Sequence, residues 1–152
     1  MSDATTSVLF VGDDNAAASV MAEAILCAVG GRRFRAFSAG FTPAPRVPVS
    51  LLEFLASRHL PVENLHARSW TEFAAPVGPR LDYVITVSER AAQAASPDWP
   101  GEPVLAHWSV EGDAWDMYWV LQRRIKIFAS LPHARLPRRA IENRVQAIST
   151  WQ

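Results

Sequence analysis

Short apolar runs alternate with longer amphipathic segments along the 152 residues of this chain. The first run, Val8 to Val11, is unbroken, as expected for a strand that is buried on both faces of a parallel sheet. Residues 17–30 are rich in Ala, Met, Glu and Leu, which favour a helix. Alternation of this kind is typical of βαβ units. The pattern predicts strands near residues 7–12, 33–38, 82–87 and 103–107, and helices near residues 17–30, 47–59, 89–95, 115–130 and 138–150.

These elements predict an α/β fold, namely a three-layer flavodoxin-like domain over residues 1–152 with a four-stranded parallel sheet and helices on both faces. Residues 60–79 contain three prolines and a glycine, so we expect a long irregular connection with one short helical turn. Ligands of such folds bind at the carboxyl ends of the strands. We therefore expect residues 12–19, 88–89 and 108–113 to converge on one edge of the sheet.

Composition excludes several classes of function. The formal net charge is zero and the isoelectric point is near 6.9, so no overall field attracts nucleic acid or an anionic membrane. No apolar stretch approaches the roughly 20 residues that span a bilayer, and the first residues lack a signal-peptide pattern. We expect a cytoplasmic protein. A basic run near the C-terminus is expected to lie on a solvated helix face; it comprises Arg135, Arg138, Arg139 and Arg144.

Residues 11–23 carry the most specific motif; they read Val-Gly-Asp-Asp-Asn-Ala-Ala-Ala-Ser-Val-Met-Ala-Glu. This segment resembles the signature loop of the low-molecular-weight protein tyrosine phosphatases and the thioredoxin-linked arsenate reductases. The pattern of that loop is Val-Cys-x-Gly-Asn-x-x-Arg-Ser-x-Met-Ala-Glu. The similarity continues in order along nearly the whole chain, through residues 34–40, 68–73, 82–87, 99–101, 106–108, 124–128 and 131–132.

The chemistry that the resemblance implies needs a thiolate to attack phosphorus, an arginine to hold the oxygens, and an acid to protonate the leaving oxygen. Gly12 matches the nucleophile and Ala18 matches the arginine. The general acid is lost or displaced by one residue, because Glu111-Gly112-Asp113 stands where the family has its Asp-Pro. Ser88 matches the redox cysteine of arsenate reductases. The pattern therefore predicts that no residue is catalytic and that no cofactor is bound.

The only cysteine, Cys27, lies within the predicted first helix, and we expect it to be a buried small apolar residue. A single thiol cannot form an internal disulfide or support the thiol relay of arsenate reductases.

The resemblance defines a degenerate loop at the family's active site. Two aspartates in this loop oppose an anion, so phosphate and other oxyanions are expected to bind weakly. The loop comprises Gly12, Asp13, Asp14, Asn15, Ala16, Ala17, Ala18 and Ser19, and its expected edge comprises Ser88, His107, Trp108, Glu111 and Asp113. Asn15, Glu23 and Ser38 match positions that bind a monovalent cation in some arsenate reductases, and a structural hydrogen-bond network is the other interpretation. The four histidines lack metal-ligand spacing, so no metal is expected.

Three hypotheses of function stay open. The first is a catalytically inactive homologue with a binding or regulatory role. The second is an enzyme of altered chemistry, an acid- or metal-dependent hydrolase that uses Asp13, Asp14, Glu111 or Asp113. The third is a protein-interaction module, with a partner protein or a homodimer bound by the aromatic helix at residues 115–119. Trp115, Tyr118 and Trp119 are expected to be core or site-wall residues, or a partner surface if several are exposed together.

Overall fold

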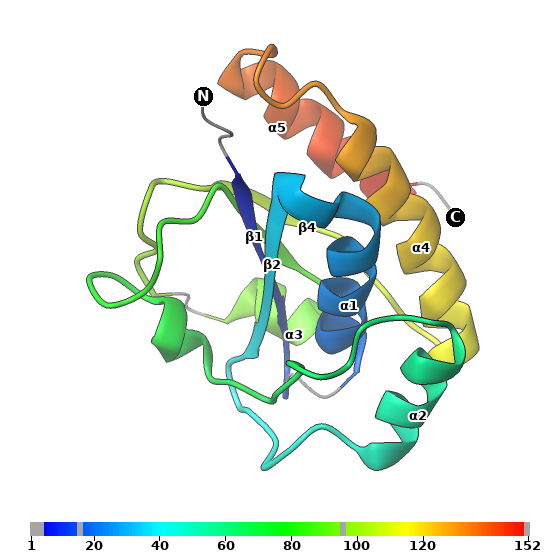
Figure 1. Cartoon of the computed structure of the whole chain (residues 1–152). Coiled ribbons are helices and arrows are strands. Elements are labelled where there is room, and N and C mark those ends of the chain that lie inside the picture. The colour runs from blue at the N-terminus through cyan, green and yellow to red at the C-terminus, as the bar shows by residue number, and fades with distance from the viewer. Residues whose placement is uncertain (1–4, 15–16, 95–96, 151–152) are drawn as a thin grey trace.

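The structure is a computed structural model that describes residues 5–14, 17–94 and 97–150. A parallel sheet lies at the centre of the molecule, with its strands in the order β2-β1-β3-β4 (Figure 1). The strands are β1 (Thr6–Gly12), β2 (Phe34–Gly40), β3 (Tyr83–Thr86) and β4 (Val104–His107). The predicted α/β, flavodoxin-like architecture is therefore confirmed.

β1 is an inner strand, which explains its unbroken apolar run. It pairs with β2 from Thr6–Phe34 to Gly12–Gly40 and with β3 from Val8–Tyr83 to Val11–Thr86. Val8 to Val11 are fully buried, as the sequence predicts for a strand covered on both faces. β2 continues two residues beyond its predicted end because it pairs with β1 as far as Gly12.

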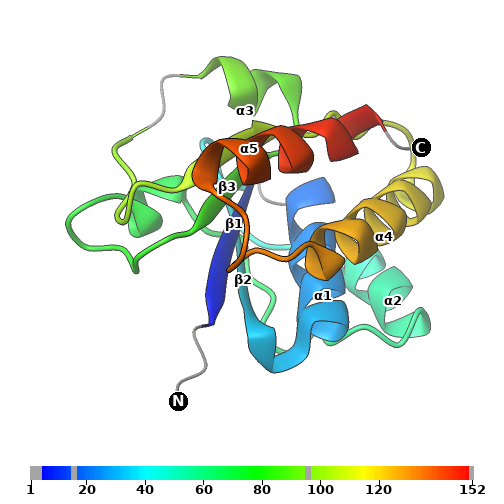
Figure 2. The ribbon, with the colours of Figure 1, turned by 90° about the horizontal axis from the view of Figure 1, so that it is seen from above.

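Five α-helices surround the sheet in the described part of the chain. Figure 2 shows α1, α2 and α4 together on one side of the strands. The helices are α1 (Ala18–Gly30), α2 (Val49–Ser57), α3 (Glu89–Gln93), α4 (Ala114–Ser130) and α5 (Arg138–Ala147), with 3₁₀ turns η1 (Gly31–Arg33), η2 (Trp70–Phe73) and η3 (Ile148–Thr150). The turn η2 is the one predicted in the long connection. In the residues described, no helix is both long enough and apolar enough to cross a membrane.

The two faces of the sheet are covered unequally. Val8 and Phe10 face the larger core, which α1, α2, α4 and α5 complete. Leu9 and Val11 face a much smaller cluster, in which Phe73 of η2 and Ala91 of α3 are the main cover. Because α3 has only five residues, part of this second face lies open.

The structure agrees with the prediction for the basic run near the C-terminus and contradicts the prediction for Cys27. All four arginines of the basic run near the C-terminus are exposed, as predicted. Cys27 is also exposed, and the expectation that it is buried was wrong. Residues 19–26 of α1 are all buried, whereas the last turn of the helix leaves Cys27 and Ala28 open to solvent.

Candidate functional site

The carboxyl ends of β1 and β3 meet at a cavity of about 210 Å³. Its walls come from the loop after β1, the start of α1, the two residues after β3, and two apolar residues near the start of α4. This is the edge of the sheet at which a parallel fold places its ligand site. The described lining residues are Gly12, Asp13, Asp14, Ala17, Ala18, Ser19, Val87, Ser88, Val110 and Met117.

Gly12 ends β1 in a backbone conformation that does not require glycine, because its φ is outside the positive range. A Cβ atom at this position would lie 3.1 Å from Ser19 Oγ and 3.9 Å from Val87 Cγ2. The first contact is tight, and the second is ordinary van der Waals contact. A side chain at position 12 would therefore meet two residues that line the cavity.

The Asp13 carboxylate is held between β1 and α3. The Ser88 hydroxyl donates a hydrogen bond to Asp13 Oδ1, and Asp13 Oδ2 lies 3.9 Å from Arg90 Nη1. Ser88 also caps α3, because its Oγ accepts a hydrogen bond from the Ala91 amide at 3.0 Å. The ion pair is largely exposed and is worth at most about 1 kcal/mol. The first loop carboxylate is thus paired within the protein.

Backbone hydrogen bonds fix the first residues of the loop against the segment after β2. Thr42 N donates to Asp13 O at 2.8 Å, and Ala44 N donates to Asp14 O at 2.8 Å. The chain thus continues beside residues 41–44 after β1 has ended. Asn15 and Ala16 lie outside the described residues.

The start of α1 brings no charged group to the cavity. Ala17 precedes the helix without a side-chain cap, and its carbonyl accepts from Met21 N at 2.9 Å. Ala18, the first helical residue, lines the cavity with a methyl group. Ser19 follows it and is 2% exposed, so its hydroxyl belongs to the buried wall.

Glu23 and Ser38 form a buried pair behind the loop. The Ser38 hydroxyl donates to Glu23 Oε1 at 2.6 Å and joins α1 to β2. Burial raises the pKa of Glu23, while the Ser38 hydrogen bond and the charge of Arg68 lower it, with a net upward shift. Asn15, the third residue of the expected cation set, lies outside the described residues. The hydrogen bond fits the interpretation of a structural network.

His107, at the end of β4, is held by several partners. Its Nδ1 lies 2.8 Å from Thr86 Oγ1, and its Nε2 lies 3.2 Å from Ser109 Oγ and 3.4 Å from Glu89 Oε1. Its backbone N and O bond the side-chain amide of Gln146. In a catalytic triad the imidazole stands between the nucleophile and the carboxylate. Here the serine and the carboxylate share one ring nitrogen, so the arrangement is not that of a Ser–His–Glu triad.

The remaining edge residues have structural contacts. Trp108 is fully buried, and its Nε1 donates to Val145 O at 2.9 Å. Asp113 caps α4 by accepting from Asp116 N at 3.0 Å. Glu111 is exposed. Across the described residues, no group of three or more His, Cys, Asp or Glu side chains is placed to hold a metal ion.

A sequence profile described as low molecular weight phosphotyrosine protein phosphatase matches residues 7–102, which run from β1 to the turn before β4. The chain belongs to this family. The match contains the loop after β1, η2 and α3. Among curated protein sequences, none matches the chain.

Solved structures of the family agree with this assignment. The thioredoxin-dependent arsenate reductase of Corynebacterium glutamicum is 26% identical with a TM-score of 0.67, over 83% of this chain and 61% of that one. An arsenate reductase from Archaeoglobus fulgidus is 27% identical with a TM-score of 0.65, over 82% of this chain and 99% of that one. A low molecular weight protein tyrosine phosphatase from Streptococcus pyogenes, 14% identical, shares the fold with a TM-score of 0.61 over 91% and 98% of the two chains. The resemblance that the sequence indicates is therefore confirmed.

Helices α2 and α4 of this family member carry an aromatic surface, which we define as Phe54, Arg58, Trp115, Tyr118 and Trp119. Trp115 and Trp119 stack at 5.9 Å with an interplanar angle of 16° and are 48% and 56% exposed, whereas Tyr118 is buried. The guanidinium of Arg58 lies 5.1 Å from the ring centroid of Trp115. The aromatic helix thus contributes one core residue and two exposed indoles.

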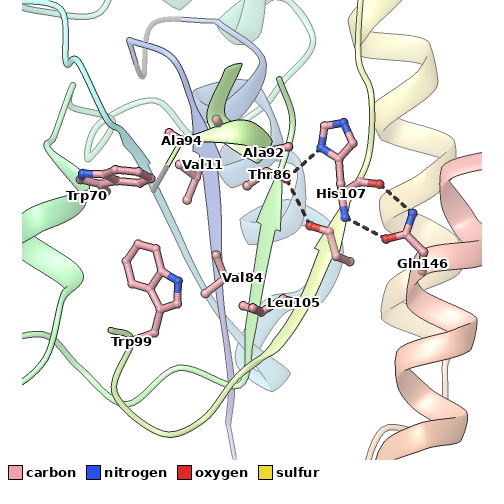
Figure 3. A pocket seen from close by; sticks show the side chains of 12 residues that line it. Val11, Trp70, Val84, Thr86, Ala92, Ala94, Trp99, Leu105, His107 and Gln146 are labelled. Atoms are coloured by element: carbon pink, nitrogen blue, oxygen red, sulfur yellow. Dashed lines mark hydrogen bonds between the residues drawn. The ribbon is translucent and has the colours of Figure 1, made fainter. Parts of the chain in front are cut away.

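A second cavity, of about 320 Å³, lies on the thinly covered face of the sheet and was not predicted from the sequence. It lies beside α3, between Trp70, Trp99 and the ends of β3 and β4 (Figure 3). The available signal was the short alanine-rich helix predicted near residues 89–95, together with Trp70 and Trp99 in the connections on either side of it. Small side chains over a sheet leave space that larger ones would fill.

Proposed function

We propose that this family member acts by binding and has no phosphatase or arsenate reductase activity. The proposal rests on Gly12 and Ala18, which line the cavity and match the positions of the family's nucleophile and arginine. Gly12 has no atom to attack phosphorus, and Ala18 has no cation to hold its oxygens. Position 12 accepts a Cβ with one tight contact, so the backbone is not the reason for the missing side chain.

The charge at the cavity supports the same proposal. The Asp13 carboxylate takes the Ser88 hydroxyl and pairs with Arg90, two groups that would otherwise favour an anion. At about 4 Å and an effective dielectric near 20, a second unit negative charge would be repelled by roughly 4 kcal/mol before solvent reduces the effect. Because Asp13 is partly exposed, the screened repulsion is about 1 kcal/mol or less, so the helix-dipole attraction of about 0.3–1 kcal/mol is largely cancelled. We expect phosphate to bind weakly.

Activity assays and a phosphate titration test the proposal together. We expect no turnover of p-nitrophenyl phosphate, none of arsenate with a thioredoxin system, and no saturation by millimolar phosphate. Asp13→Asn should strengthen phosphate binding, because it removes the nearest charge, whereas Asp98→Asn at an exposed site away from the cavity should not. Robust turnover, or a metal-dependent hydrolysis abolished in Asp13→Asn, would overturn the proposal.

One observation favours a protein as the bound partner. Trp115 and Trp119 lie side by side and about half exposed on α4. Contiguous exposed aromatic side chains are unusual on monomers, and tryptophan is enriched among residues that dominate protein interfaces. We propose a protein partner on the aromatic surface, and a second copy of this chain is the first to test.

Sedimentation of the purified chain over a wide concentration range tests this second candidate. We expect reversible self-association that the double variant Trp115→Ala/Trp119→Ala abolishes. Val77, an 84% exposed apolar residue in the long connection, supplies the control variant Val77→Ala. Association that persists in the double variant, or a monomer at every soluble concentration, would contradict self-association through this surface.

A further inference from the structure

The 320 Å³ cavity beside α3 is a built apolar chamber, separate from the loop cavity. Val11, Val84 and Leu105 project from three neighbouring strands and form its floor (Figure 3). Trp70 and Trp99 form one side, and their rings meet edge to face at 6.1 Å and 71°. Ala91 and Ala92 of α3, with Ala94 directly after the helix, border the space as well.

We propose that this cavity binds an uncharged, flat aromatic molecule of about two fused rings. The volume sets the size of the ligand: an apolar cavity of about 150 Å³ holds benzene, and this one, at about 320 Å³, has roughly twice that space. It is also within the lower part of the usual range for small-molecule sites, about 300–1,000 Å³. The proposal does not depend on the proposed function of the loop cavity.

The chemistry of the lining sets the charge of the ligand. None of the described lining residues is an acid, a lysine or an arginine. The polar groups at one end are already paired: the Thr86 hydroxyl with His107 Nδ1, and the Gln146 amide with the backbone of His107. No acid, lysine or arginine in the lining would compensate a charged ligand for the hydration that it loses, which is costly. The cavity therefore selects for uncharged molecules.

The aromatic side of the cavity is held in place before any ligand arrives. The segment around Trp99 is fixed on both sides, because Ala75 N donates to Asp98 O at 2.8 Å and Leu81 N donates to Pro100 O at 2.9 Å. Trp70 begins η2, whose first turn is closed by the Ser69–Glu72 capping box. A preorganised wall lowers the entropic cost of binding. The two indoles form an apolar wall against which a flat ring can pack.

The exposed side chain of Leu105 favours a bound ligand, because a ligand would cover it. This residue of β4 is 62% exposed although it lies on a sheet face that borders the cavity. Apolar surface is less favourable exposed to water than buried. A ring lying over the floor would cover Leu105 and the open part of the second face.

Nuclear magnetic resonance titration of the ¹⁵N-labelled full chain with indole tests the proposal. We expect saturable shifts of the Trp70 and Trp99 side-chain N–H signals. Ala92→Phe fills the cavity from exposed α3 and should weaken binding about tenfold or more by removing apolar contact. Leu105→Ser changes the floor at an exposed site and should weaken it as well. Ala28→Phe, the same substitution at an exposed position of α1, should bind as the parent does.

The charged comparator is indole-3-acetate, which has the same ring and one carboxylate. We expect it to bind about tenfold or more weakly than indole, because the lining offers its charge no partner. Three results would overturn the proposal: shifts that do not saturate, equal affinity in Ala92→Phe and the parent, or equal affinity for the two probes. Shifts confined to Trp115 and Trp119 would also overturn it, because they would place the probe on the aromatic surface.

Discussion

Glu23 is a carboxylate in a place that favours its neutral form. It is 6% exposed, and its Oε1 accepts the hydrogen bond from Ser38 at 2.6 Å. Burial, the largest cause, raises its pKa above the ordinary value of 4.5, against the opposing effects of Ser38 and Arg68. A group whose folded pKa is raised contributes stability below its unfolded pKa and loses it as pH rises through the folded pKa. Ionised Glu23 therefore destabilises the fold at neutral pH.

Glu23→Gln should make the protein more stable at pH 7. Glutamine keeps an oxygen that accepts the Ser38 hydrogen bond and carries no charge to desolvate. The advantage of the variant should shrink as pH falls towards 4.5, because Glu23 then becomes neutral in both states of the parent. Urea denaturation of both proteins across this pH range gives the free energies of unfolding.

The potassium dependence of the same measurement separates the two interpretations of this pair. A structural hydrogen bond predicts equal stability in potassium chloride and in tetramethylammonium chloride. Stabilisation of the parent, but not of Glu23→Gln, by potassium would instead support a monovalent cation site at Glu23 and Ser38.

The buried guanidinium of Arg124, in α4, joins the loop after β4 to η3. Arg124 is 4% exposed; its Nη1 donates to Ser109 O at 2.8 Å and its Nη2 donates to Ser149 O at 2.9 Å. The first bond fixes the loop after β4, and the second fixes η3. Burial lowers the pKa of Arg124 below its usual value, and its planar fork suits two carbonyls in different segments. This element-level contact explains how a loop beside the cavity is held from the core.

Arg124→Met should lower the free energy of unfolding by about 1–3 kcal/mol, because two part-buried hydrogen bonds from a charged donor are lost. Arg123→Met, the adjacent exposed residue, is the matched control and should change stability by about 0.5 kcal/mol or less. Urea denaturation followed by circular dichroism measures both. Equal effects of the two substitutions would contradict the role assigned to Arg124.

At the scale of the whole molecule, the sequence pattern predicted the order of elements because each strand and helix has a local signature. The run from Val8 to Val11 indicates a strand buried on both faces, and its position in the sheet bears this out. The topology predicts that Gly12 and Ser88 lie close together, because Gly12 ends β1 and Ser88 follows the end of β3, and the two strands are parallel. The family resemblance then identified which loop to examine.

The remaining details depend on contacts between distant residues, which local pattern does not encode. Cys27 has apolar neighbours in sequence, but it is exposed because the unbroken buried stretch of α1 ends at Leu26. The pairing of Asp13 with Ser88 and Arg90 joins segments 75 or more residues apart. The second cavity depends on how short α3 is relative to the sheet that it covers. Each of these three features depends on how distant segments of the chain pack together, so no single segment encodes it.

His133 joins three parts of the molecule, and its protonation state is fixed by two of them. Its Nδ1 lies 2.6 Å from the Tyr83 hydroxyl of β3, and its Nε2 lies 2.7 Å from Phe128 O of α4. Burial and the charge of Asp82 raise the pKa of Tyr83 to about 12, so its hydroxyl stays protonated and donates to Nδ1. Phe34 of β2 packs edge-on at 5.5 Å. The neutral imidazole with its proton on Nε2 satisfies every partner.

The whole fold should therefore lose stability when His133 is forced to take a proton. Burial, the largest cause, lowers the pKa of His133 below 6.5, with a further lowering by Arg33 against raising by the Phe128 carbonyl and Asp82. Above pH 6.5 the imidazole is neutral in both states; as pH falls, the unfolded chain takes the proton first, and stability decreases until the folded pKa is reached. We expect His133→Gln to flatten this part of the stability curve, measured by urea denaturation between pH 7.5 and 5.5, although the variant is less stable overall. His66→Gln, at an exposed position, should keep the slope of the parent, and a parental slope in His133→Gln would assign the acid sensitivity to other groups.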